Sequence, residues 1–163
     1  PAFLKKFPDA KLLYMVRDPL NVIPSGLSLV TGVLDSMFGF WSFPEHKRQV
    51  FINRLYRALV ELQLRFHDDW INDRIDKSKV AIVQFDRMMT DFDGLMDEVL
   101  PFIDHKPSNE FKRNIKETAE KQRAYKSGHK YDLSKFGITE QQIKDDCKVI
   151  YETFLNQKVN INV

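Results

Sequence analysis

The 163-residue chain is short of several features that mark specialised classes of protein. Its single cysteine, Cys147, excludes an internal disulfide and a cysteine metal cluster, so folding needs no oxidising compartment. Apolar runs stop well before the ~18 residues of a membrane-spanning helix, and the first residues lack a signal-peptide layout. Internal repeats and low-complexity linkers are also missing. We therefore expect a soluble protein with no membrane segment in this chain.

An excess of one charge is missing too. The 25 Lys and Arg residues face 23 Asp and Glu residues, for a net charge of +2, so bulk charge gives no reason to expect nucleic acid as a partner. Hydrophobic residues make up 43% of the chain and charged residues 29%, as in ordinary globular proteins. Length and composition together predict one domain over residues 1–163.

Two short apolar runs, residues 11–16 and 80–85, are typical of strands buried on both faces of a parallel sheet. Between them, apolar residues recur at three- and four-residue steps from Val50 to Trp70, which predicts a long amphipathic helix. The stretch 26–44 is apolar without periodicity, and we expect it to be irregular and partly buried. The crossover of more than sixty residues favours an α/β fold, with a parallel sheet flanked by helices.

Three more helices are predicted towards the C-terminus. Thr90-Asp91 and Pro107-Ser108 are suitable starts for the first two. Thr139 and Gln142 have the spacing of a capping box, so the last helix should start there and carry Cys147 on its apolar stripe. A buried thiol in that position is expected to be structural rather than reactive.

The turn after the first predicted strand is the most informative local feature. Arg17 ends the strand, Asp18 is a good N-cap, Pro19 suits the first helical position and Ser25 follows eight residues after the arginine. In open parallel sheets, ligands bind beyond the carboxyl ends of strands, where a helix N-terminus offers unpaired N–H groups. A guanidinium and a hydroxyl there suit a phosphate, although an arginine that ends a strand is more often a surface salt-bridge partner.

Residues 11–25, KLLYMVRDPLNVIPS, resemble the segment of PAPS-dependent sulfotransferases in which a strand ends in Arg-Asp/Asn-Pro and a serine lies eight positions on. PAPS is 3′-phosphoadenylyl sulfate, the sulfuryl donor. The resemblance implies that Arg17 and Ser25 hold the donor's 3′-phosphate. Residues 80–88 are similar to the family's strand ending in Tyr-Glu-Asp-Leu, which places Phe85 near the adenine. Residues 125–137 resemble a C-terminal stretch of bacterial-type members, in which basic residues lie near the nucleotide. Arg123 and Lys126 belong to a basic cluster that could contact the 3′-phosphate or form a solvated loop.

The chain also departs from this family pattern. No Gly-Lys-Ser/Thr motif or glycine-rich phosphate loop is present, so the resemblance implies a P-loop NTPase-like sulfotransferase fold that is N-terminally truncated. The catalytic residues are then unknown, and residues 1–163 alone should bind the donor weakly and turn over poorly. Pro24 should kink its helix just before Ser25. Phe85 can stack on a base, but it lacks the hydroxyl of the usual tyrosine.

As a sulfotransferase, the protein would move a sulfuryl group from PAPS to a hydroxyl or amine of a small-molecule or carbohydrate acceptor, without a metal. The alternative is a non-catalytic nucleotide-binding or assembly module that keeps part of the fold. A P-loop kinase is a remoter interpretation, because no Walker lysine is present. The expected location is the cytoplasm, with the Golgi lumen as the alternative.

Two further features have both a structural and a functional interpretation. The aromatic residues of the irregular stretch, with Trp41 among them, could wall an apolar acceptor pocket or pack in the core. His67-Asp68-Asp69 contains residue types that bind metal ions, but neighbouring residues on a helix point to different faces. A surface helix end is the better interpretation of that triplet.

Overall fold

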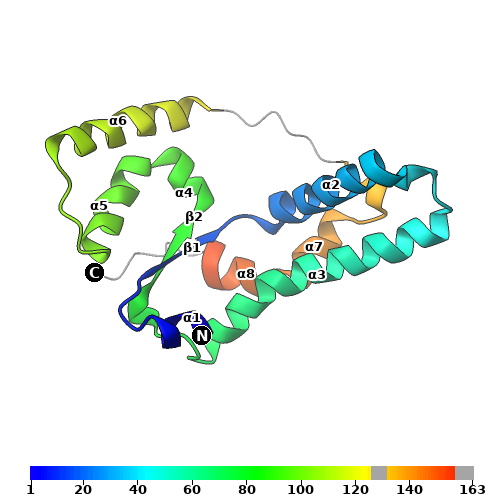
Figure 1. Ribbon diagram of the computed structural model, residues 1–163, viewed down its shortest axis with the longest axis horizontal. Helices are drawn as coiled ribbons and strands as arrows, with labels where there is room; N and C mark the ends of the chain where they lie inside the picture. Colours follow the sequence, from blue (N-terminus) through cyan, green and yellow to red (C-terminus); the bar gives the residue numbers. More distant parts are fainter. Residues whose placement is uncertain (126–131, 157–163) are drawn as a thin grey trace. The chain divides into compact units, whose positions relative to one another are not determined.

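The computed structural model describes residues 1–125 and 132–156 (Figure 1). The chain falls into two compact units, which are described separately. The first comprises residues 1–17, 69–128 and 154–163, and the second comprises residues 18–68 and 129–153. This division does not test whether the units fold independently, so the single domain stays a prediction.

The first unit contains a parallel pair of strands, β1 (Leu12–Val16) and β2 (Val80–Gln84). Their register runs from Leu12 opposite Val80 to Val16 opposite Gln84. Both strands and their parallel pairing confirm the predicted α/β class. The expectation that both strands are buried on two faces holds for β2 only. On β1 the burial alternates with period two, and Leu13 and Met15 are each half exposed, so one face of that strand is poorly covered.

The sequence predicts two helices of the first unit, α5 (Phe92–Phe102) and α6 (Asn109–Ala124). Ser108 caps the longest of them, since its side chain accepts a hydrogen bond from the Phe111 N–H at 3.1 Å. The core packs Ala81 and Val83 of β2 against an apolar stripe of α5. The helical elements are α1 (Ala2–Lys6), η2 (Lys77–Lys79), α4 (Phe85–Thr90), α5 (Phe92–Phe102) and α6 (Asn109–Ala124).

The second unit is helical. Its two long helices are α2 (Pro19–Phe38) and α3 (Glu45–Ile71), of which the last three residues of α3 belong to the first unit. The predicted amphipathic helix is confirmed by α3. The shorter elements are η1 (Phe40–Ser42), η3 (Ser134–Phe136), α7 (Glu140–Asp146), α8 (Lys148–Ile150) and the π-helix η4 (Tyr151–Leu155), of which the last two residues belong to the first unit.

The expectation of an irregular stretch over residues 26–44 is wrong for most of that length. The helix α2 continues to Phe38, and Pro24, Gly26 and Gly32 lie within it. A buried face that includes Ile23 and Leu27 outweighs the low helix propensity of these three residues. Gly26 allows the Leu59 side chain to pack close to the α2 backbone, since a Cβ atom at Gly26 would lie 2.9 Å from that side chain.

The C-terminal helix starts as predicted but does not run on as one helix. The Thr139 hydroxyl accepts a hydrogen bond from the Gln142 N–H at 3.1 Å and caps α7. Cys147, with φ of −108°, separates α7 from α8, and a π-helix follows. The thiol is fully buried, as expected for a structural cysteine.

One helix of the described residues, α2, is long and apolar enough to cross a membrane by length and composition alone. An 18-residue window of this 20-residue helix has a mean hydropathy of 1.2, although no single run of apolar residues suggests this. A core helix of a soluble protein meets the same two criteria. The property therefore does not assign α2 to a membrane.

Candidate functional site

The carboxyl ends of β1 and β2 bring two of the predicted site residues together. Val16 and Gln84 form the last aligned pair of the two strands, so Arg17 and Phe85 come next at the same edge of the sheet. The Cζ atom of Arg17 lies 4.2 Å from the centroid of the Phe85 ring. This is a close cation–π contact, and it holds the guanidinium in a defined place.

The charge of Arg17 has no carboxylate partner in residues 1–125 and 132–156. The structure therefore gives no support to a salt-bridge role for this half-buried residue. A guanidinium carries five N–H donors, and contact with one aromatic ring does not use them all, so it can still bind the oxygens of an anion. The arrangement is thus suited to a phosphate or carboxylate.

The start of α2 is capped as the sequence predicts. The Asp18 Oδ1 atom accepts a hydrogen bond from the Leu20 N–H at 2.8 Å, and Pro19 occupies the first helical position. The N–H groups of Asn21 and Val22 donate to the Asp18 carbonyl at 2.8 and 3.1 Å. Free backbone donors were expected here, but that expectation is wrong, because the cap uses these groups and proline has none. The N–H groups of Leu20, Asn21 and Val22 are therefore not available to an anion.

A further residue, Tyr151, contributes to this cap and could not be found from the sequence. Its hydroxyl donates a hydrogen bond of 2.6 Å to Asp18 Oδ1 across 133 residues of sequence. Burial raises the pKa of the Tyr151 hydroxyl far above its ordinary value, and the bond to Asp18 raises it further. Tyr151 therefore remains a neutral donor and fixes the Asp18 carboxylate.

Ser25 lies on α2, immediately after the buried Pro24. It belongs to the second unit, whereas Arg17 belongs to the first. Convergence of the two side chains on one phosphate therefore stays a prediction.

The predicted basic cluster is only partly described. Arg123, in the last turn of α6, forms an ion pair with Asp93, with 3.0 Å between its Nη1 atom and Asp93 Oδ1. The pKa of the Asp93 carboxyl is lowered, first by backbone hydrogen bonding and then by Arg123. Both side chains are exposed, so a phosphate could compete for Arg123 at little cost. Lys126 lies outside the described residues.

The aromatic stretch divides between core and cavity wall. Phe40 is buried, and its ring packs edge-on against Trp41, Phe43 and Phe51, as the core interpretation predicts. Trp41 also lines a cavity of about 250 Å³, together with Thr31 of α2. The Lys135 ammonium lies 4.2 Å from the Trp41 ring centroid, so one face of that ring is already occupied.

The triplet His67-Asp68-Asp69 lies near the end of α3, as predicted, and Asp68 is exposed, but His67 itself is buried. The His67 Nε2 atom lies 3.1 Å from the Thr153 hydroxyl, a partner too distant in sequence to predict. The described part of the chain contains no group of three or more His, Cys, Asp or Glu side chains placed to hold a metal ion.

Parallel strands with a helical crossover, and a cationic and an aromatic residue at their carboxyl ends, define an α/β protein of the class that binds ligands at this edge. A family model described as the Sulfotransferase family matches residues 1–109. The chain therefore belongs to the sulfotransferase family, which is a family of transferases. The match includes Arg17, Ser25 and Phe85 and ends before Arg123 and Lys126. Comparisons with curated proteins and with solved structures gave no match.

Proposed function

We propose that this protein binds PAPS and transfers its sulfuryl group to a hydroxyl or amine of a small-molecule or carbohydrate acceptor. Arg17 and Ser25 hold the donor's 3′-phosphate, and Phe85 lies against the adenine. The observation that carries the proposal is the contact of the Arg17 guanidinium with the Phe85 ring at the carboxyl edge of the sheet. Membership of the sulfotransferase family supports the transfer reaction in general.

The contact also limits how a nucleotide can bind. Arg17 covers one face of the Phe85 ring, so a base can stack only on the opposite face or against the ring edge. The edge of the guanidinium remains available for two phosphate oxygens, in the bidentate geometry that lysine cannot provide. In this proposal the base contacts the Phe85 ring and the 3′-phosphate contacts the Arg17 guanidinium, so the two groups of the nucleotide do not compete for one side chain.

In the transfer, the bond between sulfur and the bridging oxygen of the donor breaks, and the acceptor oxygen or nitrogen bonds to sulfur. The acceptor proton passes to a base, and 3′,5′-ADP leaves. The protein's main contributions are positioning and stabilisation of charge on the leaving phosphate. None of the residues 1–163 is assigned as the base or as a phosphosulfate loop, so we expect donor binding with poor turnover. A cytoplasmic location is part of the proposal and stays a prediction.

Calorimetry with 3′,5′-ADP and 5′-AMP tests the phosphate assignment. A hydrogen bond to a charged group contributes about 1.5 to 3 kcal/mol, so loss of the 3′-phosphate should weaken binding by about ten-fold to a hundred-fold. Arg17→Ala should remove this discrimination. Phe85→Leu should weaken both nucleotides through the loss of base stacking, and it should also reduce the discrimination in part, because the ring positions the Arg17 guanidinium.

Arg113→Ala is the matched control, since Arg113 lies exposed on α6, 3.9 Å from Glu117. That variant should bind both nucleotides like the wild type. Equal affinity of the wild type for 3′,5′-ADP and 5′-AMP contradicts the assignment. The same conclusion follows if the Arg17 and Arg113 variants behave alike.

A further inference from the structure

A second candidate site lies in the second unit, between α3 and α7. It is a groove of about 540 Å³, a size that suits a small molecule. All of its lining residues belong to one unit, and none is among the predicted donor-binding residues. The lining residues are Asn53, Tyr56, Arg57, Val60, Glu61, Leu64, Gln142 and Asp146.

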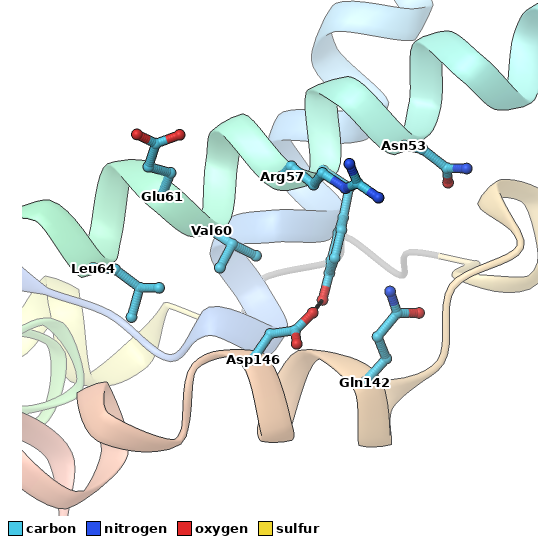
Figure 2. A pocket seen from close by; sticks show the side chains of 8 residues that line it. Asn53, Arg57, Val60, Glu61, Leu64, Gln142 and Asp146 are labelled. Carbon is cyan, nitrogen blue, oxygen red and sulfur yellow. Dashed lines mark hydrogen bonds between the residues drawn. The ribbon is translucent and has the colours of Figure 1, made fainter.

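One side of the groove offers a cation without a counterion. Arg57 and Glu61 are four residues apart on α3, yet they form no ion pair, and Glu61 points away from α7 (Figure 2). An arginine placed before a glutamate is the weaker order for such a helical pair. Arg57 has no carboxylate partner elsewhere in residues 1–125 and 132–156 either.

Two carboxamides add donors to this cation. The Asn53 Oδ1 atom accepts a hydrogen bond from Gln49 at 3.1 Å, which leaves the Asn53 amide nitrogen for a ligand. Gln142 points from α7 toward α3 (Figure 2). A guanidinium with two carboxamide donors matches a carboxylate, which only accepts hydrogen bonds.

A fixed carboxylate lies on the other side of the groove. The buried Tyr56 donates a hydrogen bond of 2.6 Å to Asp146 Oδ2. Burial, followed by this bond to Asp146, raises the pKa of the Tyr56 hydroxyl well above its ordinary value, so the donor keeps its proton. The Asp146 Oδ1 atom has no bond within the described part of the chain and can accept one from a ligand ammonium.

Apolar side chains lie next to these charges. Val60 and Leu64 point from α3 toward α7 (Figure 2). The groove thus combines a site for a carboxylate, a site for an ammonium and a surface for a hydrocarbon chain. Each of these matches one group of an amino acid with an aliphatic side chain.

We propose that this groove binds a small zwitterion of the α-amino acid type with an apolar side chain. Its carboxylate binds Arg57 and the two carboxamides, its ammonium binds Asp146, and its side chain contacts Val60 and Leu64. The proposal does not rest on the PAPS site, because the two sites share no residue.

Four probes test the three contacts in the full chain: leucine, leucinamide, 4-methylpentanoate and glycine. Leucinamide lacks the carboxylate, 4-methylpentanoate lacks the ammonium and glycine lacks the side chain. Titrations followed by the NMR signals of the Asn53 and Gln142 side-chain amides should show leucine binding about ten-fold tighter than each of the other three. Comparable affinity for all four, or no binding of leucine at any soluble concentration, overturns the proposal.

Two variants assign the contacts. Arg57→Gln should remove the preference for leucine over leucinamide and keep the preference over 4-methylpentanoate. Asp146→Asn should remove the preference for leucine over 4-methylpentanoate and keep the preference over leucinamide. The side-chain oxygen of the asparagine can still accept the hydrogen bond from Tyr56. The controls are Arg54→Gln and Asp145→Asn, which are exposed neighbours outside the groove.

The control variants should bind leucine like the wild type. The proposal is overturned if the control and groove variants change affinity equally. If a groove variant fails to fold, the four probes on the wild type still decide the question.

Discussion

Cys147 shows how burial determines the chemistry of a single residue. Its side chain is fully buried, and burial, with smaller contributions from Asp146 and Asp18, raises the pKa of the thiol from 9.0 to about 11. A thiolate is the reactive form of cysteine, so this residue is a poor nucleophile at neutral pH. The apolar stripe of the sequence predicted the burial, but the neighbouring carboxylate of Asp18 comes from a distant part of the chain.

The raised pKa of Cys147 makes stability depend on pH. Above pH 9 the unfolded chain loses the thiol proton, whereas the folded protein keeps it until about pH 11. The unfolded state then binds fewer protons, so the free energy of unfolding is unaffected below pH 9 and falls as pH rises above it. The full loss is about 2 to 3 kcal/mol, because one pH unit corresponds to about 1.4 kcal/mol.

Urea denaturation of the wild type and of Cys147→Ala between pH 8 and 10 measures this effect. Below pH 10 the tyrosines with raised pKa values contribute less than Cys147, since their ordinary pKa is 10.0. The alanine variant starts from a lower stability because it leaves a small cavity, but its free energy of unfolding should fall less than that of the wild type over this interval. Parallel curves for the two proteins would assign the pH dependence to other groups.

Local caps could be predicted from the sequence, and their distant partners could not. Asp18 and Thr139 accept hydrogen bonds from N–H groups two and three residues away, which residue type and spacing alone indicate. The bonds from Tyr151 to Asp18 and from Tyr56 to Asp146 join residues 133 and 90 positions apart. Only tertiary packing brings such residues together, so the groove between α3 and α7 was not predicted.

At the scale of elements, α2 shows where propensity fails as a guide. Three glycines suggested an irregular stretch, but two of them lie inside the helix, and only Gly39 ends it. Gly39 has φ of 63° and ψ of 47°, and its N–H donates to the Asp35 carbonyl at 2.8 Å. This left-handed conformation is the common end of a helix, and it is strained for residues with a side chain.

Gly32 within α2 and Gly39 at its C-terminal end therefore predict opposite effects of the same substitution. Gly39→Ala should destabilise the protein by about 1 kcal/mol, because a Cβ atom is disfavoured at positive φ. Gly32→Ala should stabilise it by about 0.5 to 1 kcal/mol, because a Cβ atom there meets nothing within 4 Å and alanine favours the helix. Thermal unfolding of both variants measures the difference. A stabilising Gly39→Ala would contradict the left-handed conformation of Gly39, and a destabilising Gly32→Ala would contradict the open space around Gly32.

At the scale of the whole molecule, the sequence predicted the sheet better than the division of the chain. Two apolar runs and a long crossover were enough to predict a parallel pair of strands, because short connections cannot join parallel strands. The chain passes between the two compact units four times, and one passage lies inside the continuous helix α3. No shift of composition marks these passages, so the sequence had no signal for them.

The four passages predict that both units unfold together. Separating one unit would require melting α3 within its length and would leave fewer than ninety residues to bury a core.

The two tryptophans report on one unit each, since Trp70 lies in the first and Trp41 in the second. Trp41→Phe and Trp70→Phe leave one reporter each, and tryptophan fluorescence follows the remaining one in urea. Far-ultraviolet circular dichroism of the same variant gives the transition of the whole backbone. If the chain is one domain, the fluorescence and dichroism midpoints coincide within each variant, as two-state unfolding requires. A fluorescence transition that precedes the backbone transition in either variant would show that its unit unfolds alone, and the single-domain prediction would be wrong.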